Sequence, residues 1–534
     1  MLQTLTKVTP EVLAAMETVK HHRKTKEVFL EFSLGSQFDH LIKSGIEQTG
    51  RHVLMADPAR ITAEDVKKIQ PLGIILSGGP ASVYQDPPPF DGRIFDLGIP
   101  VLGICLGFQL WAQYIGVGVE SAQKREFGIH TLKILRPSSR LFAGIERETP
   151  VLESHGDIVL PSPKLHVIAK TDNCPVAAAK HKHLWGVQFH PETTPTKYGL
   201  EILENFCSKI CGAKIRYPAH DVAKEKIQVL RERIGERKVL LALSGGSDSS
   251  TVAYLLKHAF EGRSGQLRAV YLKGIDRPDD EAHVFKYFGN QDWLELKIVD
   301  ATRQFLRALR GKRTGRQKRL AMRKVYKTLL EREIRLWRAK LIAQGTLYTD
   351  IVESGGGYRT GARRATIKIH HNPRLRFSVP KLEPLADCFK DTARALGREI
   401  GVPDELLFRH PFPGPGLLVR IAGEVRRKKL TIAREADRIF IEELRRWNLY
   451  HMTWQAGAVV TRDVVTCTKG DDAALGWVIA LWAVNSKDGF TATAVDLPYE
   501  FWQHVDRRMV NEIREVGATV TRNTNKPPGT IEWE

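Results

Sequence analysis

The chain has 534 residues, of which 42% are hydrophobic and 27% charged, which is enough for two to four globular domains with proper cores. No apolar stretch is long enough to cross a bilayer and no apolar signal core opens the chain, so we expect a cytoplasmic protein without a membrane partner. Six cysteines are too few for a disulfide scaffold, and a formal charge of +20 favours anionic partners in general.

The first 26 residues are polar and form a predicted N-terminal extension, with a short helix expected over residues 10–19. A basic stretch at residues 21–26 leaves a mitochondrial presequence open, although Glu11 and Glu17 count against one. From residue 27 onward apolar strands alternate with helical patterns, which indicates a doubly wound sheet with mainly parallel strands. The four strands expected here cover residues 27–32, 51–56, 72–76 and 99–104.

Cys105 lies on the turn between the fourth strand and a helix predicted over residues 108–115. A sharp strand-to-helix turn presents a nucleophile to substrate, and a helix N-terminus lowers the pKa of a thiol. The backbone N–H groups of Leu106, Gly78 and Gly79 are candidates for an oxyanion hole. A lone cysteine is more often a buried packing residue, so this interpretation depends on partner residues elsewhere.

A thiolate nucleophile needs a base, and the best candidate is His190 in the stretch GVQFHPE. Glu192 follows it by two residues and is a candidate to orient the imidazole as the third member of a triad. The motifs SGGP, GICLGFQ, SHGD and GVQFHPE occur in this order within one domain length. Together they resemble the class I glutamine amidotransferase domain over about residues 27–210. The resemblance implies that Cys105 attacks the side-chain amide of glutamine, which yields glutamate and ammonia.

A second doubly wound domain is predicted after a linker at residues 216–222, and it begins with a buried strand at 239–243 and a helix at 251–260. The SGGSDSS loop between them has glycines that let backbone approach a ligand and a helix start that favours an anion. It lacks the Gly-Lys-Ser/Thr ending of a Walker A loop and resembles the PP-loop of ATP pyrophosphatases. The residues implied to bind ATP are Ser244, Gly245, Gly246, Ser247, Asp248, Ser249 and Ser250.

An amidotransferase followed by a PP-loop resembles the GMP synthetase family. The stretches QGTLYTDIVES, KIHHN, RHPFPGPGLLVRIAGEV and KPPGTIEWE strengthen this resemblance. It implies two doubly wound α/β domains followed by a smaller α+β domain that forms a homodimer and completes the nucleotide site. The predicted limits are 1–26 for the extension, 27–212 for the amidotransferase, 213–408 for the PP-loop domain and 409–534 for the C-terminal domain.

The family resemblance also implies a reaction with glutamine, ATP and XMP as substrates. ATP adenylates the C2 oxygen of XMP with release of pyrophosphate, and ammonia then displaces AMP to give GMP. Mg²⁺ is the implied cofactor, with Asp248 as a candidate ligand. The residues implied to bind XMP are Arg277, Gln344, Lys526 and Glu532.

Several residues depart from the family pattern. Leu272 and Lys273 stand where an Asp-Asn pair is usual, and Trp482 stands where an arginine is common. Glu31 replaces a usual aspartate, and the loop at residues 32–37 is two residues longer than the family's. These differences put the acceptor site of the synthetase half in question.

The segment from residue 303 to 340 is strongly basic, with 15 Lys or Arg and two acidic residues. We interpret it as a solvated helical lid and leave open an added anion surface for nucleic acid, although no nucleic-acid-binding motif is present. The leading hypothesis is a glutamine-dependent GMP synthetase, a carbon–nitrogen ligase. The alternatives are a divergent relative with an altered acceptor or a lost synthetase step, and a regulatory or nucleic-acid-binding protein on this scaffold.

Overall fold

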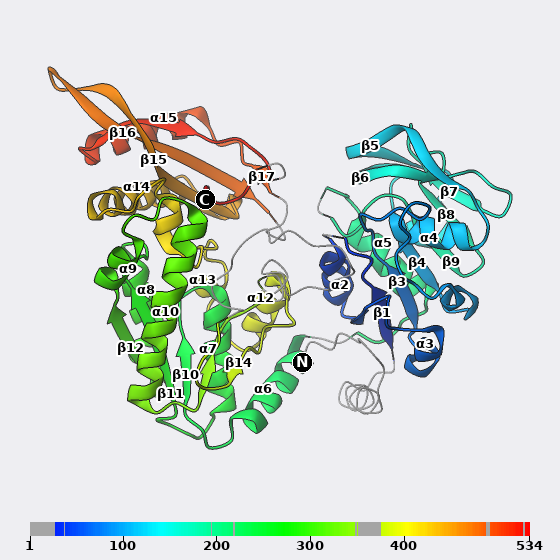
Figure 1. Ribbon diagram of the computed structural model, residues 1–534, viewed down its shortest axis with the longest axis horizontal. Helices are drawn as coiled ribbons and strands as arrows, with labels where there is room; N and C mark the ends of the chain where they lie inside the picture. The colour runs from blue at the N-terminus through cyan, green and yellow to red at the C-terminus, as the bar shows by residue number, and fades with distance from the viewer. Residues whose placement is uncertain are drawn as a thin grey trace. The chain divides into compact units, whose positions relative to one another are not determined.

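In a computed structural model the chain divides into two compact units, the first ending at Val222 and the second beginning at Ala223 (Figure 1). The structure describes residues 27–36, 38–193, 195–216, 219–347, 350, 375–486, 492–526 and 529–534. The predicted N-terminal extension, part of the predicted linker and the KIHHN stretch lie outside these residues. No helix in the described part is long and apolar enough to span a membrane.

Unit 1 is built on a nine-stranded sheet with the strand order β2-β1-β3-β4-β9-β8-β7-β5-β6 (Figure 1). The first five strands in this order pair in parallel, and the others continue the sheet with antiparallel pairs. The strands are β1 Val28–Phe32, β2 His52–Ala56, β3 Gly73–Leu76, β4 Val101–Ile104, β5 Val119–Ile134, β6 Glu148–Val159, β7 His166–Lys170, β8 Ala178–His181 and β9 Leu184–Val187. The helices are α2 Asp39–Gln48, α3 Ala63–Ile69, α4 Leu106–Tyr114 and α5 Gly199–Asn205.

The parallel strands of unit 1 are apolar except for Glu31 and His52, because both faces of the sheet are covered. Along β1, Leu30 and Phe32 pack into the core on one face, whereas Phe29 packs into the core on the other. Helix α3 begins with a capping box in which Thr62 and Asp65 satisfy each other's backbone N–H groups. The four strands predicted from the sequence are confirmed, and they are β1 to β4.

Unit 2 contains a five-stranded sheet with the order β12-β11-β10-β13-β14, all of whose pairs are parallel. Helix α7 begins at Ser247, four residues before the predicted start at Thr251, because the loop serines adopt helical geometry. The strands are β10 Val239–Ala242, β11 Leu267–Lys273, β12 Glu295–Asp300, β13 Leu341–Ala343 and β14 Lys381–Leu382. The helices around them are α6 Ala219–Ile234, which crosses the boundary between the units, α7 Ser247–Ala259, α8 Asp280–Phe288, α9 Thr302–Leu309, α10 Gly315–Trp337, α12 Lys390–Glu399 and α13 Asp404–Leu407.

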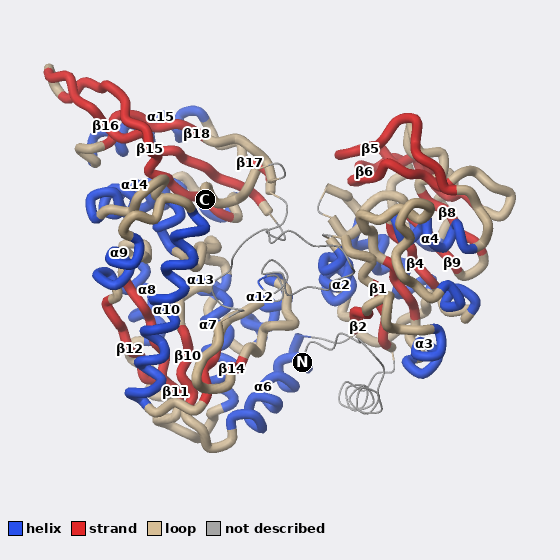
Figure 2. Tube along the Cα trace, viewed as in Figure 1, coloured by secondary structure: helices blue, strands red, loops and turns tan. Residues whose placement is uncertain are grey.

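The C-terminal part of unit 2 is a four-stranded, mostly antiparallel sheet dominated by the long β15–β16 hairpin (Figure 2). One apolar core runs through both sheets of this unit and includes Leu240, Phe440 and Ile479, so the two parts fold as a single compact body. Its elements are α14 Arg427–Arg446, β15 Gln455–Lys469, β16 Asp472–Asn485, β17 Thr493–Ala494, α15 Tyr499–Glu512 and β18 Val516–Thr521.

The basic segment predicted to be a solvated lid is helical, but it is not solvated on all sides. Helix α10 buries Met322, Leu330 and Ile334 in the core of unit 2. Lys318 on the same helix is fully buried and donates to the carbonyl of Ile421 and to Glu534. The positive charges occupy the outward face of an amphipathic core helix, so the lid interpretation is wrong.

Candidate active sites

The backbone at Cys105 is strained in the way that a nucleophile turn requires. Cys105 has φ +50° and ψ −106°, a conformation that residues with a side chain rarely adopt. The turn is tight because Gly103 and Gly107 bring strand and helix together. A Cβ at Gly107 would lie 2.5 Å from the carbonyl oxygen of Leu76, and one at Gly103 would lie 2.6 Å from the backbone of Gly107. The thiol therefore sits at the start of α4, with only 6% of the residue exposed.

His190 and Glu192 lie beside the thiol, as predicted. Nδ1 of His190 is 2.7 Å from Oε1 of Glu192, and both side chains are buried. A Cβ at Gly78 would lie 2.9 Å from Cε1 of His190 and 3.6 Å from Cβ of Cys105. Gly78 therefore lies next to both the imidazole and the cysteine side chain. Burial disfavours the imidazolium, but the Glu192 carboxylate and the hydrogen bond with Cys105 outweigh it and raise the pKa of His190 well above its usual range.

The residues predicted for an oxyanion hole lie on the turn after β3 and at the first position of α4. Leu106 is the first helical residue, so its N–H has no partner within the helix. Gly79 packs against Leu106, since an added Cβ would lie 2.8 Å from the leucine Cδ2. In the part of the chain that the structure describes, the N–H groups of Gly78, Gly79 and Leu106 donate no hydrogen bond. They are thus available to a developing oxyanion.

Two amide side chains that the sequence analysis did not single out also reach the thiol. Nε2 of Gln188 donates to Sγ of Cys105 at 3.5 Å. Nε2 of Gln109 donates to Oε1 of Gln188 at 3.3 Å and to the carbonyl of Asp157 at 2.9 Å. Both glutamines lie inside the GFQ and VQF stretches already identified, so their position in the motifs was the available signal.

Glu31, which replaces the usual aspartate, lies fully buried on β1. Neither of its carboxyl oxygens makes a hydrogen bond within the described residues. Burial, followed by the charge of Asp39, raises the pKa of Glu31 well above its usual range, and Lys43 offsets this only in part. The raised pKa favours the neutral form of this carboxyl group.

The SGGSDSS loop lies between β10 and α7 and has the geometry of an anion site. Gly245 has φ +74°, and a Cβ there would lie 2.5 Å from Val284. The hydroxyl of Ser249 accepts from the N–H of Ser244 at 3.1 Å and lies 2.9 Å from the Ser244 hydroxyl. The hydroxyl of Ser250 is buried and makes no hydrogen bond within the described residues. These hydrogen bonds fix the loop at the N-terminus of a 13-residue helix, where an anion is favoured.

Lys390 is a functional candidate that the sequence analysis missed. It opens α12, and its Nζ donates to the two carboxylate oxygens of Asp248 at 2.7 and 2.8 Å. The same Nζ donates to the Ser247 hydroxyl at 2.7 Å. No local pattern around residue 390 marks this lysine, because its partners lie more than 140 positions earlier in the chain. It places a positive charge directly on the loop that is predicted to hold phosphate.

Two of the four residues implied to bind XMP are joined by a buried ionic network. Nε of Arg277 donates to Asp437 at 2.6 Å, and Arg420 donates to Asp437 at 2.7 Å and to Glu532 at 2.9 Å. The ring of Phe412 lies under both guanidinium groups, at 4.5 and 5.1 Å from its centroid. This network connects Arg277 to Glu532 through residues that the sequence analysis did not name.

The other two residues of that set are not part of the network. Gln344 is buried, and its Oε1 makes no hydrogen bond within the described residues. The next residue, Gly345, packs on the SGGSDSS loop, because a Cβ there would lie 2.7 Å from the N atom of Ser249. Lys526 exchanges backbone hydrogen bonds with Ala492 near the C-terminus.

The three departures in unit 2 are accommodated by ordinary packing. Leu272 belongs to the apolar core, and Lys273 pairs with Glu281 at 2.9 Å. Trp482 is fully buried, and the guanidinium of Arg420 lies 5.4 Å from its ring centroid. Trp482 therefore packs against Arg420, which connects Arg277 and Glu532 in the ionic network.

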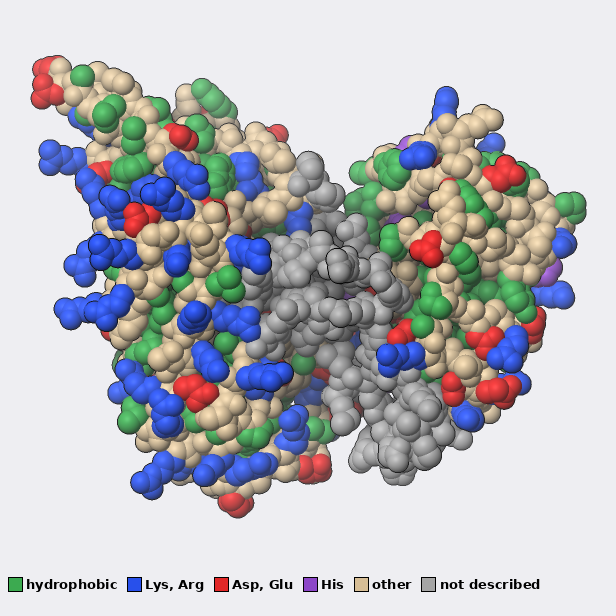
Figure 3. Space-filling view, viewed as in Figure 1, with side chains coloured by type: hydrophobic (Ala, Val, Ile, Leu, Met, Phe, Trp, Pro, Cys, Tyr) green, Lys and Arg blue, Asp and Glu red, His purple; other side chains and the backbone are tan. Residues whose placement is uncertain are grey.

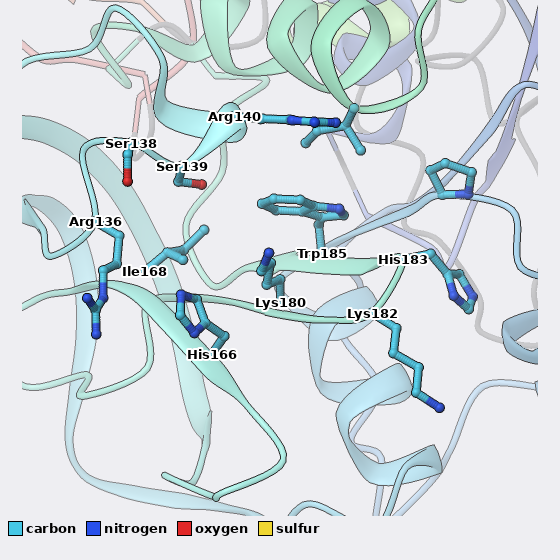
Figure 4. A pocket seen from close by; sticks show the side chains of 12 residues that line it. Arg136, Ser138, Ser139, Arg140, His166, Ile168, Lys180, Lys182, His183 and Trp185 are labelled. Carbon is cyan, nitrogen blue, oxygen red and sulfur yellow. The ribbon is translucent and has the colours of Figure 1, made fainter.

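A hollow of about 600 Å³ lies elsewhere on unit 1, beside Trp185 (Figure 4). Arg136, Arg140, Lys180 and Lys182 surround it, and no Asp or Glu lines it. None of its lining residues belongs to the triad, so we do not place the thiol chemistry there.

The chain matches three family models and many curated proteins. The models are Glutamine amidotransferase class-I over residues 32–210, NAD synthase over 222–325 and GMP synthase C terminal domain over 442–533. A glutamine-hydrolyzing GMP synthase of Carboxydothermus hydrogenoformans is 41% identical and covers 96% of this chain and 100% of the relative. One of Streptococcus thermophilus is also 41% identical, over 94% of this chain and 95% of the relative.

Proposed function

Because this chain belongs to the glutamine-hydrolysing GMP synthase family, we propose that Cys105, His190 and Glu192 carry out its glutamine hydrolysis. The chain is a carbon–nitrogen ligase that uses glutamine as the amide donor and ATP and XMP as further substrates. The observation that supports the triad best is the strained turn at Cys105, which places the thiol against the His190–Glu192 pair. Strain of this kind persists only where the surrounding structure enforces it.

In the proposed glutaminase step, the thiolate of Cys105 attacks the side-chain carbonyl carbon of glutamine. The oxygen of the tetrahedral intermediate accepts hydrogen bonds from the N–H groups of Gly79 and Leu106. The protonated His190 gives its proton to the leaving nitrogen, and ammonia departs as the C–N bond breaks. His190 then removes a proton from water, whose oxygen attacks the thioester carbon, and glutamate leaves as the C–S bond breaks. Glu192 stabilises the imidazolium in both halves of the reaction.

In the proposed synthetase step, the C2 oxygen of XMP attacks the α-phosphorus of ATP, and pyrophosphate leaves. Ammonia then attacks C2, and AMP carries away the former C2 oxygen, which leaves the amino group of GMP. We assign the departing pyrophosphate to the loop of Ser244 to Ser250, whose glycines and helix start favour an anion. Lys390 adds a point charge at the same place.

Magnesium is proposed as the cofactor that binds together with ATP. Mg²⁺ is commonly held by one or two carboxylates together with substrate phosphates, and Asp248 is the one carboxylate of the loop, so the residues fit this mode of binding. The ion would offset negative charge on the leaving pyrophosphate. Lys390, which bonds Asp248, keeps that carboxylate fixed at the mouth of the loop.

For XMP we propose contacts with Arg277, Gln344, Lys526 and Glu532. Nη2 of the buried Arg277 and Oε1 of the buried Gln344 make no hydrogen bond within the described residues, which leaves one donor and one acceptor for a nucleotide. Lys526 is suited to a phosphate by its charge. Glu532 acts through Arg420, to which it is hydrogen-bonded.

We further propose a cytoplasmic homodimer formed through the C-terminal part of the chain. The hairpin of β15 and β16 exposes Val464 and Leu475, the latter to 73%, and these apolar side chains suit a subunit contact. The predicted limits of the four segments, 1–26, 27–212, 213–408 and 409–534, are kept as part of this proposal.

The decisive experiment measures pyrophosphate release from MgATP with and without XMP, using an ammonium salt as the nitrogen source. Ammonium bypasses Cys105, so the assay isolates the unit that carries Leu272, Lys273 and Trp482. We expect XMP-dependent pyrophosphate release with GMP formed in equal amount. Protein that hydrolyses glutamine but releases no pyrophosphate with XMP would contradict the assignment of the nucleotide residues and direct the search to other acceptors.

A further inference from the structure

A second group of ionisable side chains lies on the strand that passes the thiol. Strand β6 carries Glu153, Ser154 and His155, and the carbonyl oxygen of Ser154 lies 4.0 Å from Sγ of Cys105. Because side chains alternate along a strand, Glu153 and His155 share one face. Glu126 on β5 is the direct cross-strand partner of His155, so its side chain falls on that face as well.

These three side chains are buried and close together. The side chains of Glu126 and Glu153 are 0% exposed and that of His155 is 2% exposed. Nε2 of His155 lies 3.1 Å from Oε2 of Glu153 and 3.4 Å from Oε2 of Glu126. Neighbouring ligand atoms around a tetrahedral zinc ion, with bonds of about 2.0–2.1 Å, are separated by about 3.3 Å. The observed separations match that geometry.

Hydrogen bonds within the described residues leave part of this group unsatisfied. Neither carboxylate oxygen of Glu153 and neither ring nitrogen of His155 makes a hydrogen bond. Glu126, by contrast, accepts from the hydroxyl of Thr171 at 2.9 Å and from Nδ2 of Asn173 at 3.1 Å. A carboxylate oriented by such hydrogen bonds, next to buried ionisable groups that face one another without a hydrogen bond, is typical of a metal site.

A histidine–glutamate pair in unit 2 differs from this group in the charge around its carboxylate. Nε2 of His504 is also 3.1 Å from a buried carboxylate, that of Glu443, but Arg508 neutralises this carboxylate at 2.6 Å. Among the ion pairs of the described residues, no Lys or Arg meets Glu126 or Glu153. Within the described residues, no Lys or Arg side chain therefore balances the two carboxyl groups on β5 and β6.

We propose that Glu126, Glu153 and His155 bind one divalent transition-metal ion of the zinc class. Two carboxylate oxygens and one imidazole nitrogen are a donor set that zinc accepts. His130 on β5 lies 3.4 Å from Oε1 of Glu126 with 28% of its side chain exposed, so it borders this group of three residues without belonging to it. The ion ties β5 to β6 beside Cys105 and so has a structural role, separate from glutamine hydrolysis.

The test measures zinc bound to the full chain carrying Cys105→Ala, since this substitution removes the thiol that would otherwise compete for the metal. After treatment with a chelator and addition of zinc, elemental analysis should find about one ion per chain. Glu153→Gln and His155→Gln in the same background should weaken zinc binding at least about tenfold. The matched control, His504→Gln, should bind zinc like the parent.

Because a ligand variant can fail to fold, a second measurement uses the Cys105→Ala chain alone. Cobalt(II) added in place of zinc should give visible d–d bands without thiolate-to-cobalt charge transfer, since the ligands are oxygen and nitrogen. Well below one zinc per chain, binding unchanged by Glu153→Gln, or a thiolate charge-transfer band from nearby Cys174 would each overturn the proposal.

Discussion

The two units of the molecule carry charge in different ways. Residues 27–216 contain 20 Lys or Arg and 20 Asp or Glu. Residues 217–534 contain 56 Lys or Arg and 39 Asp or Glu. Lys and Arg side chains are spread over the visible face of unit 2 (Figure 3). The positive excess thus belongs to the unit that handles ATP and XMP, and the unit that acts on glutamine, a substrate without net charge, is balanced. A positive excess of this kind favours anionic substrates such as nucleotides.

Buried charges differ between the units as well. In unit 2 the buried arginines Arg277 and Arg420 are paired with buried carboxylates. In unit 1 the buried Glu31, Glu126 and Glu153 form no ion pair with Lys or Arg among the described residues. These three buried acids of unit 1 are therefore left to protonation, histidine or a bound ion, whereas the carboxylates beside Arg277 and Arg420 in unit 2 are neutralised by guanidinium groups. The predictions below test how far the units are independent.

The largest effect is expected from Cys105→Ala. Glutamine-dependent GMP formation should fall at least about a thousandfold, because the nucleophile is lost. Ammonium-dependent GMP formation should stay close to that of the parent, since unit 2 is untouched. Assays with the two nitrogen sources on the same preparation measure both, and an equal loss in both would break the separation of the units.

The second-largest effect is expected from Lys390→Gln, which changes unit 2 and leaves unit 1 intact. Loss of the charge next to Asp248 should lower the ammonium-dependent rate by about 10²–10³-fold, the usual size for one electrostatic contact to a leaving group. Glutamine hydrolysis measured as glutamate release should not change. Lys286→Gln, which removes an exposed pair with Glu405, is the control and should behave like the parent.

A smaller effect on stability is expected from Glu31→Gln. Burial and the charge of Asp39 raise the pKa of Glu31, so the folded chain holds a proton that the unfolded chain releases. The stability contribution of this group is complete below the unfolded pKa of about 4.3 and is lost, by about 1.4 kcal/mol per pH unit, as the pH rises toward the folded pKa. The substitution should raise the Tm of unit 1 in calorimetry near neutral pH and have little effect in acid. An equal change in Tm at both pH values would contradict the neutral carboxyl.

The smallest effect is expected from salt. Added potassium chloride should raise the KM for ATP in the ammonium-dependent assay several-fold, because it screens the positive excess of unit 2. The KM for glutamine in glutamate release should stay constant. Equal sensitivity of both constants would show that the charge difference between the units has no functional consequence.

Local motifs identified candidate residues for both sites, and the roles of these residues stay predictions. The turn at Cys105, the pair of His190 and Glu192, and the loop from Ser244 to Ser250 each lie within a few residues of a strand end, where local pattern is most informative. The starts of α4 and α7 were predicted two and four residues late, because glycine and serine in a first helical turn resemble a loop. Lys390, Gln109 and Gln188 were missed because they act through contacts across the fold.

By itself the sequence determined the α/β fold class and the order of the chemistries along the chain, and it predicted the nucleophile. These depend on spacing between neighbouring residues, which covalent geometry converts directly into local structure. Only the tertiary structure decided that α10 is a core helix and that Trp482 supports Arg420. It alone also brought Glu126, Glu153 and His155 onto one face. Packing between segments far apart in the chain sets these features, and no short-range pattern encodes it.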